Sequence, residues 1–139
     1  MDEERRLRYQ GKIHWIRGRA TLISTWTEGV ELREIGEDQK TTLAIFKAFQ
    51  EITEGCMDLI AMYLRDHQIP SRDDYSNIEL ITGFSSGQKQ LLREMNGLRN
   101  RIIHRYNGTD ERLALEGIIR SLPEIRSIIR EEEKWILND

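Results

Sequence analysis

Residues 38–67 carry apolar side chains at every third or fourth position, and this spacing constrains the fold more than any other feature of the sequence. On a helix of about 3.6 residues per turn, side chains spaced in this way lie on one side. The stretch therefore predicts a long helix with one side packed into a core. That side is formed by Leu43, Phe46, Phe49, Ile52, Cys56, Leu59, Ile60 and Tyr63.

The same period recurs along the rest of the chain and predicts an all-α fold. The composition agrees, because charged residues make up 32% of the chain and Pro occurs only twice, as expected for long helices with polar outer faces. A length of 139 residues suits one domain with one core, covering residues 1–139. We expect an up-and-down bundle of about five helices, the other four over residues 2–28, 77–83, 85–107 and from residue 109 or 110 onwards.

Loop and capping residues predict where these helices begin and end. Residues 29–38 and 68–76 have the polar, Gly- or Pro-containing composition of connections. Pro123 should kink or break the last helix, and the acidic run over residues 131–133 predicts a solvated face near its end. The expected helix ends are Ser85 or Ser86 at the start of the fourth helix, Asn107-Gly108 at its end, and Thr109 or Asp110 at the start of the last helix.

The single cysteine, Cys56, lies within the apolar side of the 38–67 helix. No histidine nearby could activate it, so we expect a small buried hydrophobe rather than a nucleophile. A lone cysteine suits a reducing compartment, no Cys/His cluster has zinc spacing, and we expect neither a metal nor a cofactor. Because the sequence has no signal core and no run of about 20 apolar residues, we expect a cytoplasmic protein without membrane contact.

The basic residues are concentrated between residues 89 and 105, although the whole chain has a net charge of −3. Any contact with nucleic acid therefore has to rest on a local patch rather than on the overall charge. Five basic side chains stand there against one acid, Glu94. They are Lys89, Arg93, Arg99, Arg101 and Arg105.

Arg99 falls on the apolar side of its predicted helix, which is an unusual place for an arginine. A guanidinium cannot lose its charge in a protein, and burying it unpaired is costly. Arg99 therefore needs an acidic partner, a cleft, or a subunit interface that leads its head group to an anion. Its predicted neighbours on that side are Leu92, Met95, Ile102, Ile103 and Tyr106.

Asn100 and His104 are four positions apart and share the adjoining side of the helix. Arg99 and His104, in contrast, point roughly 140° apart on a straight helix, so they do not face each other. Three arrangements could bring them together: a loosened helix end, long side chains converging on a groove, or two copies of the helix meeting across a dimer axis.

An arginine that holds a phosphodiester and a histidine that moves a proton near neutral pH suffice to cleave RNA through its own 2′-hydroxyl, without a metal ion. The alternative from spacing alone is structural. Arg99 would then pair with Glu51, Glu54 or Asp58 from the 38–67 helix, and His104 would be a polar helix-end residue favoured by the helix dipole.

The segment Arg99-Asn100-Arg101-Ile102-Ile103-His104-Arg105-Tyr106 resembles the motif of the HEPN superfamily and, within it, of HepT-like toxins from prokaryotic toxin–antitoxin pairs. That motif is Arg, a polar residue that is often Asn, three further residues, His, any residue and Tyr. The segment matches it at every defined position. Its place late in a helix of an all-α chain strengthens the resemblance.

The resemblance implies a homodimer in which two motifs form one composite, metal-independent ribonuclease site. Arg99 would orient the phosphate, His104 would transfer protons, and Asn100 would hold the histidine or the phosphate. Tyr106 corresponds to the tyrosine that an MNT-type nucleotidyltransferase antitoxin can modify with AMP. The remaining basic residues, Arg101, Arg105, Arg93 and Lys89, would bind the RNA substrate.

Two other functions are compatible with the same residues. One is a non-catalytic helical module that binds a nucleotide or a nucleotidyltransferase partner through Arg99 and Tyr106. The other is a structural helical dimer whose Arg99 is paired within its own subunit and lies far from any open groove.

Overall fold

A computed structural model describes residues 2–104 and 108–137 of the chain, and within these ranges it contains six helices and no strand. The predicted all-α fold is therefore confirmed, with one helix more than expected. The helices are α1 (Glu3–Thr27), α2 (Leu32–Glu37), α3 (Gln39–Asp66), α4 (Asp74–Leu80), α5 (Ser86–Ile103) and α6 (Gly108–Leu137).

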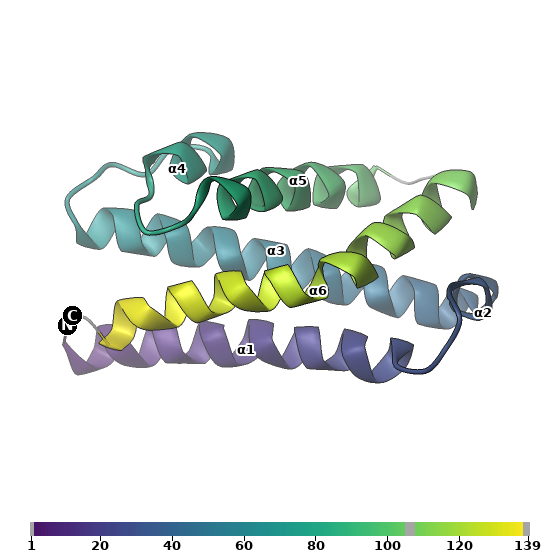
Figure 1. The fold of residues 1–139 in the computed structure, drawn as a ribbon. Helices are drawn as coiled ribbons and strands as arrows, with labels where there is room; N and C mark the ends of the chain where they lie inside the picture. The colour runs from purple at the N-terminus through teal and green to yellow at the C-terminus, as the bar shows by residue number, and fades with distance from the viewer. Residues whose placement is uncertain (1, 105–107, 138–139) are drawn as a thin grey trace.

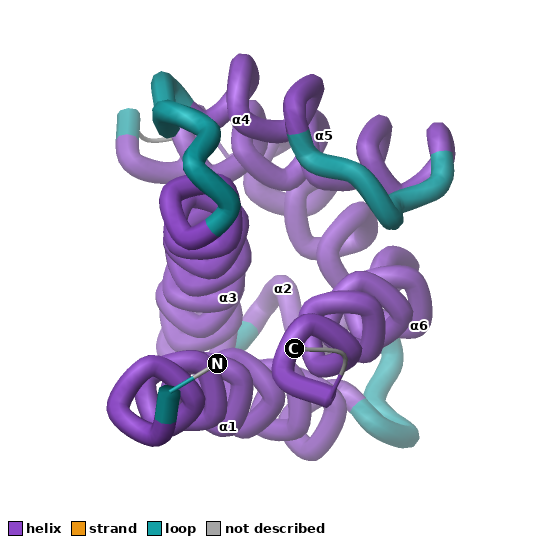
Figure 2. Tube along the Cα trace, turned by 90° about the vertical axis from the view of Figure 1, so that its left-hand side faces the viewer, coloured by secondary structure: helices purple, strands orange, loops and turns teal. Residues whose placement is uncertain are grey.

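The four longer helices, α1, α3, α5 and α6, run alternately up and down and lie side by side (Figure 1). Viewed along their axes, they surround a common interior (Figure 2). α1 packs against both α3 and α6, whereas α5 packs against α3, α4 and α6. The short helices α2 and α4 lie in the connections at opposite ends of the bundle (Figure 1).

Close packing of α1 against α3 depends on Gly55 in the middle of α3. A Cβ atom added to Gly55 would collide with the side chain of Ile16 from α1, so a larger residue would force the two helices apart. Tyr9 is also fully buried on this side of α1, and its hydroxyl donates to Asp66 Oδ2 at 2.6 Å. This hydrogen bond holds the last turn of α3 against α1. The first turn of α3 is held against α2, because Thr42 Oγ1 donates to the carbonyl of Ile35.

Both short helices differ from the sequence prediction. α2 lies in the stretch predicted as a connection, where Ile35 supplies a buried side chain. α4 begins three residues earlier than predicted, because Asp73 caps it: the Asp73 side chain accepts a hydrogen bond from the Ser76 backbone N–H. Helices of one or two turns carry too few apolar residues to show a period, so they are hard to predict from spacing.

The connection between α5 and α6 also differs from the prediction. α5 ends at Ile103, before the predicted stop at Asn107-Gly108, and α6 already begins at Gly108. α6 continues through Pro123 without a break, so of the two predicted outcomes, a kink or a break, the break does not occur. Figure 1 shows α6 changing direction along its length, as expected for a helix with an internal proline.

The acidic run near the end of α6 is not a solvated face, contrary to the prediction. Glu132 is 0% exposed, and neither of its carboxyl oxygens has a hydrogen-bond partner of good geometry among the described residues. Its neighbours in the run do reach the surface: Glu131 pairs with Lys134 at 2.8 Å, and Glu133 pairs with Arg17 of α1.

Burial favours the neutral form of the Glu132 side chain. Removal from water raises the pKa of Glu132 well above its ordinary 4.5, and this outweighs the opposite effect of the neighbouring Cys56 thiol, a weak hydrogen-bond donor. Burial likewise raises the pKa of Cys56, with Glu132 adding to the effect. The prediction that Cys56 is a buried hydrophobe and not a thiolate nucleophile is consistent with its complete burial.

Some apolar residues predicted to face the core lie at the surface. Leu7 and Leu43 are each 57% exposed, although both share the apolar period of their helices. In the described part of the chain, no helix combines the length and the apolar content that crossing a membrane requires.

We predict that Glu132→Gln removes a specific pH dependence of stability. Between pH 4.5 and the raised pKa of Glu132, the folded protein retains a proton that the unfolded chain releases, so the free energy of unfolding should fall as pH rises. The variant should lack this loss of about 1.4 kcal/mol per pH unit. Urea unfolding from about pH 5 to about pH 8 measures it. If the free energy of unfolding changes with pH in the same way for wild type and variant, the prediction is contradicted. The control is Glu131→Gln, which changes a partly exposed glutamate and should keep the pH dependence of wild type.

Candidate functional site

α5 carries the motif, and its start is fixed by a reciprocal cap. Ser85 Oγ accepts a hydrogen bond from the Gln88 backbone N–H at 3.1 Å, and Gln88 Oε1 accepts one from the Ser85 backbone N–H at 2.9 Å. This capping box satisfies backbone N–H groups that the first turn leaves without partners. Leu91, Leu92 and Met95 are buried and dock the helix onto the bundle. The motif follows at the other end of α5.

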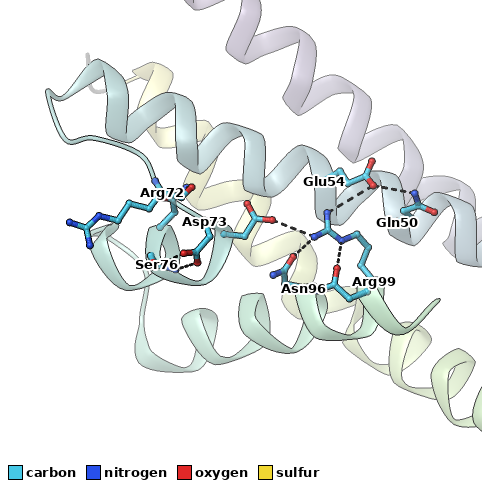
Figure 3. A network of polar contacts seen from close by, with 10 residues as sticks. Gln50, Glu54, Arg72, Asp73, Ser76, Asn96 and Arg99 are labelled. Carbon is cyan, nitrogen blue, oxygen red and sulfur yellow. Dashed lines mark hydrogen bonds and ion pairs between the residues drawn. The ribbon is translucent and has the colours of Figure 1, made fainter. Parts of the chain in front are cut away.

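Arg99 is largely buried, with 16% of its side chain exposed, and its guanidinium is surrounded by acceptors (Figure 3). Nη2 donates to Asn96 Oδ1 at 2.7 Å and to Asp74 Oδ2 at 3.4 Å. Nε donates to Asn100 Oδ1 at 3.3 Å. Nη1 lies 3.9 Å from Glu54 Oε1, an ion pair that is too long for a hydrogen bond. The permanent charge of Arg99 is therefore balanced inside its own chain.

Only one of the three carboxylates considered from the sequence pairs with Arg99. Glu54 lies on the side of α3 that faces α5 and also accepts a hydrogen bond from Gln50 Nε2 at 3.1 Å. Glu51 and Asp58 instead pair with α1. Arg19 Nε lies 3.7 Å from Glu51, and Lys12 Nζ lies 3.0 Å from Asp58.

Asn96 and Asp74 also contact Arg99, although neither is among its partners predicted from the sequence. Asn96 is 2% exposed and precedes Arg99 by three positions, so it lies one helical turn away on the same side. This spacing of three positions is enough to predict the contact between Asn96 and Arg99. Asp74 is the first residue of α4, and nothing in its sequence neighbourhood indicates which part of α5 it meets.

His104 is the first residue after α5 and is exposed. Its backbone N–H donates to the carbonyl of Asn100 at 3.2 Å, which ties it to the last turn. Within the described part of the chain, no hydrogen bond joins Arg99 to His104. Asn100 contacts both residues, Arg99 through its side chain and His104 through its carbonyl. The absence of a direct hydrogen bond is consistent with the predicted divergence of Arg99 and His104 along α5, which stays a prediction.

The basic residues predicted to bind RNA face different neighbours. Arg93 Nη1 lies 2.6 Å from Glu79 Oε1, and Lys89 Nζ donates to the Glu79 carbonyl at 3.1 Å, so both contact the end of α4. Arg101 is exposed and lines a pocket of about 310 Å³ between α5 and α6. Arg105 and Tyr106 lie outside the described residues, and an RNA-binding role for any of these residues stays a prediction.

Potential metal ligands are dispersed in the described ranges. Over residues 2–104 and 108–137, no three His, Cys, Asp or Glu side chains lie close enough together to hold an ion.

Comparison with known proteins identifies the family of this chain. The profile of the family described as ribonuclease HepT-like matches residues 16–132. An Archaeoglobus fulgidus protein named "Putative RNase" is 35% identical over 121 residues, which cover 82% of each chain. A second protein of the same name and organism is 30% identical over 109 residues, covering 76% of each chain. The chain belongs to the HepT-like ribonuclease family of the HEPN superfamily.

Proposed function

We propose that this protein is a cytoplasmic RNA endonuclease, the toxin of a toxin–antitoxin pair, whose site combines Arg99 and His104 from two subunits. The observation that carries the proposal is the complete motif of residues 99–106 in a chain of the HepT-like family. The names of the archaeal relatives support ribonuclease activity. The exposed position of His104 just after α5 leaves its ring accessible to a substrate.

The chemistry requires an anion-binding group and a proton carrier. The 2′-oxygen of the RNA attacks the adjacent phosphorus while the bond from phosphorus to the 5′-oxygen breaks, leaving a 2′,3′-cyclic phosphate and a 5′-hydroxyl. Arg99 would stabilise the charge on the phosphoryl oxygens. One histidine would accept the proton from the 2′-hydroxyl, and a second would donate a proton to the leaving 5′-oxygen. A dimer supplies both histidines.

We expect the purified protein to cleave RNA in the presence of EDTA and to leave an RNA with 2′-deoxy substitutions intact. Arg99→Ala and His104→Ala should each lower the cleavage rate by on the order of 100-fold or more, because each removes a group that acts on the transition state. Electrophoresis of labelled RNA measures cleavage. Arg33→Ala in α2 and His14→Ala in α1 are matched controls that should cleave normally. Unchanged cleavage by both motif variants would refute the proposal.

A dimer would bring together Arg99 and His104, which no hydrogen bond joins within the described part of one chain. Two apolar side chains near the motif end of α5 and α6 support this arrangement: Ile103 is 50% exposed, and Leu113, which lines the same pocket as Arg101, is 63% exposed. Both side chains are far more exposed than those of the core. Contact with a second copy would bury both and bring the two His104 residues together.

We predict that the double variant Ile103→Glu, Leu113→Glu is a folded monomer that has lost cleavage, because charged side chains cannot be buried unpaired in an apolar interface. Sedimentation velocity measures the oligomeric state. The control is Leu7→Glu, which changes an equally exposed leucine near the opposite end of the bundle and should leave the dimer intact. A double variant that remains a dimer would show that copies associate elsewhere.

We further propose that an MNT-type nucleotidyltransferase silences the protein by modifying Tyr106, which lies outside the described residues. The tyrosine oxygen would attack the α-phosphorus of ATP and release pyrophosphate. Bulky anionic groups beside Arg99 would then occupy the place of the RNA phosphate. This proposal rests on the motif, in which Tyr106 follows His104 by two positions.

Incubation with such a nucleotidyltransferase, ATP and magnesium should increase the intact mass by one or more AMP units and abolish cleavage. Tyr106→Phe should stay unmodified, because it lacks the attacking oxygen, whereas Tyr75→Phe, which removes an exposed tyrosine of α4, should be modified like wild type. Mass spectrometry measures both. Equal labelling of wild type and Tyr106→Phe would place the modification on another residue.

One observation favours a second candidate, the structural helical dimer. Arg99 is paired with Glu54 and Asp74 in its own chain, as a structural arginine would be. Such a dimer would cleave no RNA with or without EDTA. The cleavage assay above therefore separates the two functions.

A further inference from the structure

The short helix α4 contacts α5 at both of its ends. At its C-terminal end, Glu79 binds Arg93 through its carboxylate and Lys89 through its carbonyl. At its N-terminal end, Asp74 Oδ2 lies 3.4 Å from Arg99 Nη2. The contacts of α4 thus extend over about three turns of α5, and its first residue lies next to the arginine of the motif.

The backbone that carries Asp74 is fixed by a buried asparagine. Asn77 is 2% exposed; its Oδ1 accepts a hydrogen bond from the Arg72 backbone N–H at 2.6 Å, and its Nδ2 donates to the Arg72 carbonyl at 3.1 Å. Asp73 adds the helix cap through Ser76 (Figure 3). Residues on both sides of Asp74 are therefore held in place, which limits where its carboxylate can lie.

These contacts occupy one edge of the Arg99 guanidinium. Nε donates to Asn100, and Nη2 donates to both Asn96 and Asp74. Nη1 lies 3.9 Å from Glu54 Oε1, beyond hydrogen-bonding distance, and donates no hydrogen bond to a described residue. Within the described part of the chain, a phosphate oxygen bound at the Nη1 edge would therefore displace no hydrogen bond.

We propose that Asp74 is a positioning residue: held by α4, it orients the Arg99 guanidinium so that Nη1 is presented to the RNA phosphate. This inference rests on the proposed ribonuclease function for its kinetic consequence, but the orientation itself does not. A misplaced arginine loses contacts that are strongest in the transition state, so kcat should suffer more than KM.

The test compares three variants of α4 in cleavage of a fluorophore- and quencher-labelled RNA. Asp74→Ala should lower kcat by about 10- to 100-fold and leave KM within about threefold of wild type. Asp74→Asn keeps an acceptor oxygen and should recover most of kcat. Asp73→Asn removes the same charge one residue away and preserves the cap, so it should behave as wild type. If Asp74→Ala cleaves like wild type, or raises KM alone, the positioning role is refuted.

A second measurement is independent of cleavage. The guanidinium Nε–H signal of Arg99 in a ¹⁵N–¹H NMR spectrum can be assigned by its loss in Arg99→Lys. It should shift in Asp74→Ala, shift less in Asp74→Asn and stay unchanged in Asp73→Asn. An unchanged signal in Asp74→Ala refutes the proposal whatever the RNA assay shows. A shifted signal in a protein that cleaves no RNA supports the orientation by Asp74 and refutes the ribonuclease function.

Discussion

The charge of Arg99 is the constraint on which the arrangement of α3, α4 and α5 depends. A guanidinium cannot be neutralised by losing a proton, so a largely buried arginine must be surrounded by acceptors. Here those acceptors come from three helices: Glu54 from α3, Asp74 from α4, and Asn96 and Asn100 from α5. Any shift of one helix against the others would leave part of this charge unpaired. The position of α4 therefore depends on the motif, because Asp74 of α4 contacts Arg99 directly.

The buried Glu132 shows a different solution to the same problem. A carboxyl group can be buried without a cation because it can keep its proton, and the raised pKa of Glu132 reflects this. The bundle therefore contains one largely buried charge, which is paired with partners, and one fully buried acid, whose neutral form is favoured by burial. The first arrangement keeps a permanent positive charge at the motif, whereas the second favours an uncharged side chain within the core.

The sequence predicted the long helices well because each contains enough turns for an apolar period to be visible. It failed for α2 and for the start of α4, whose few residues carry no period and whose caps depend on side-chain contacts. Glu132 was predictable in principle, since it lies three, four and seven positions after Ile129, Ile128 and Ile125. At the site, Glu54 was one of three candidates for Arg99, but Asp74 could not be predicted, because its contact with α5 depends on how the loop before α4 closes.

The up-and-down order of the four long helices also fixes where the chain can be extended. The first turn of α1 and the last turn of α6 lie together at one end of the bundle, where Arg6 Nη1 donates to the Ile136 carbonyl at 3.3 Å (Figure 1). The connection from α5 to α6 lies at the other end. A fluorescent probe attached to the first turn of α1 or to the last turn of α6 would therefore stand a full helix length away from the motif, and a linker between these two turns would need to cross only a short distance.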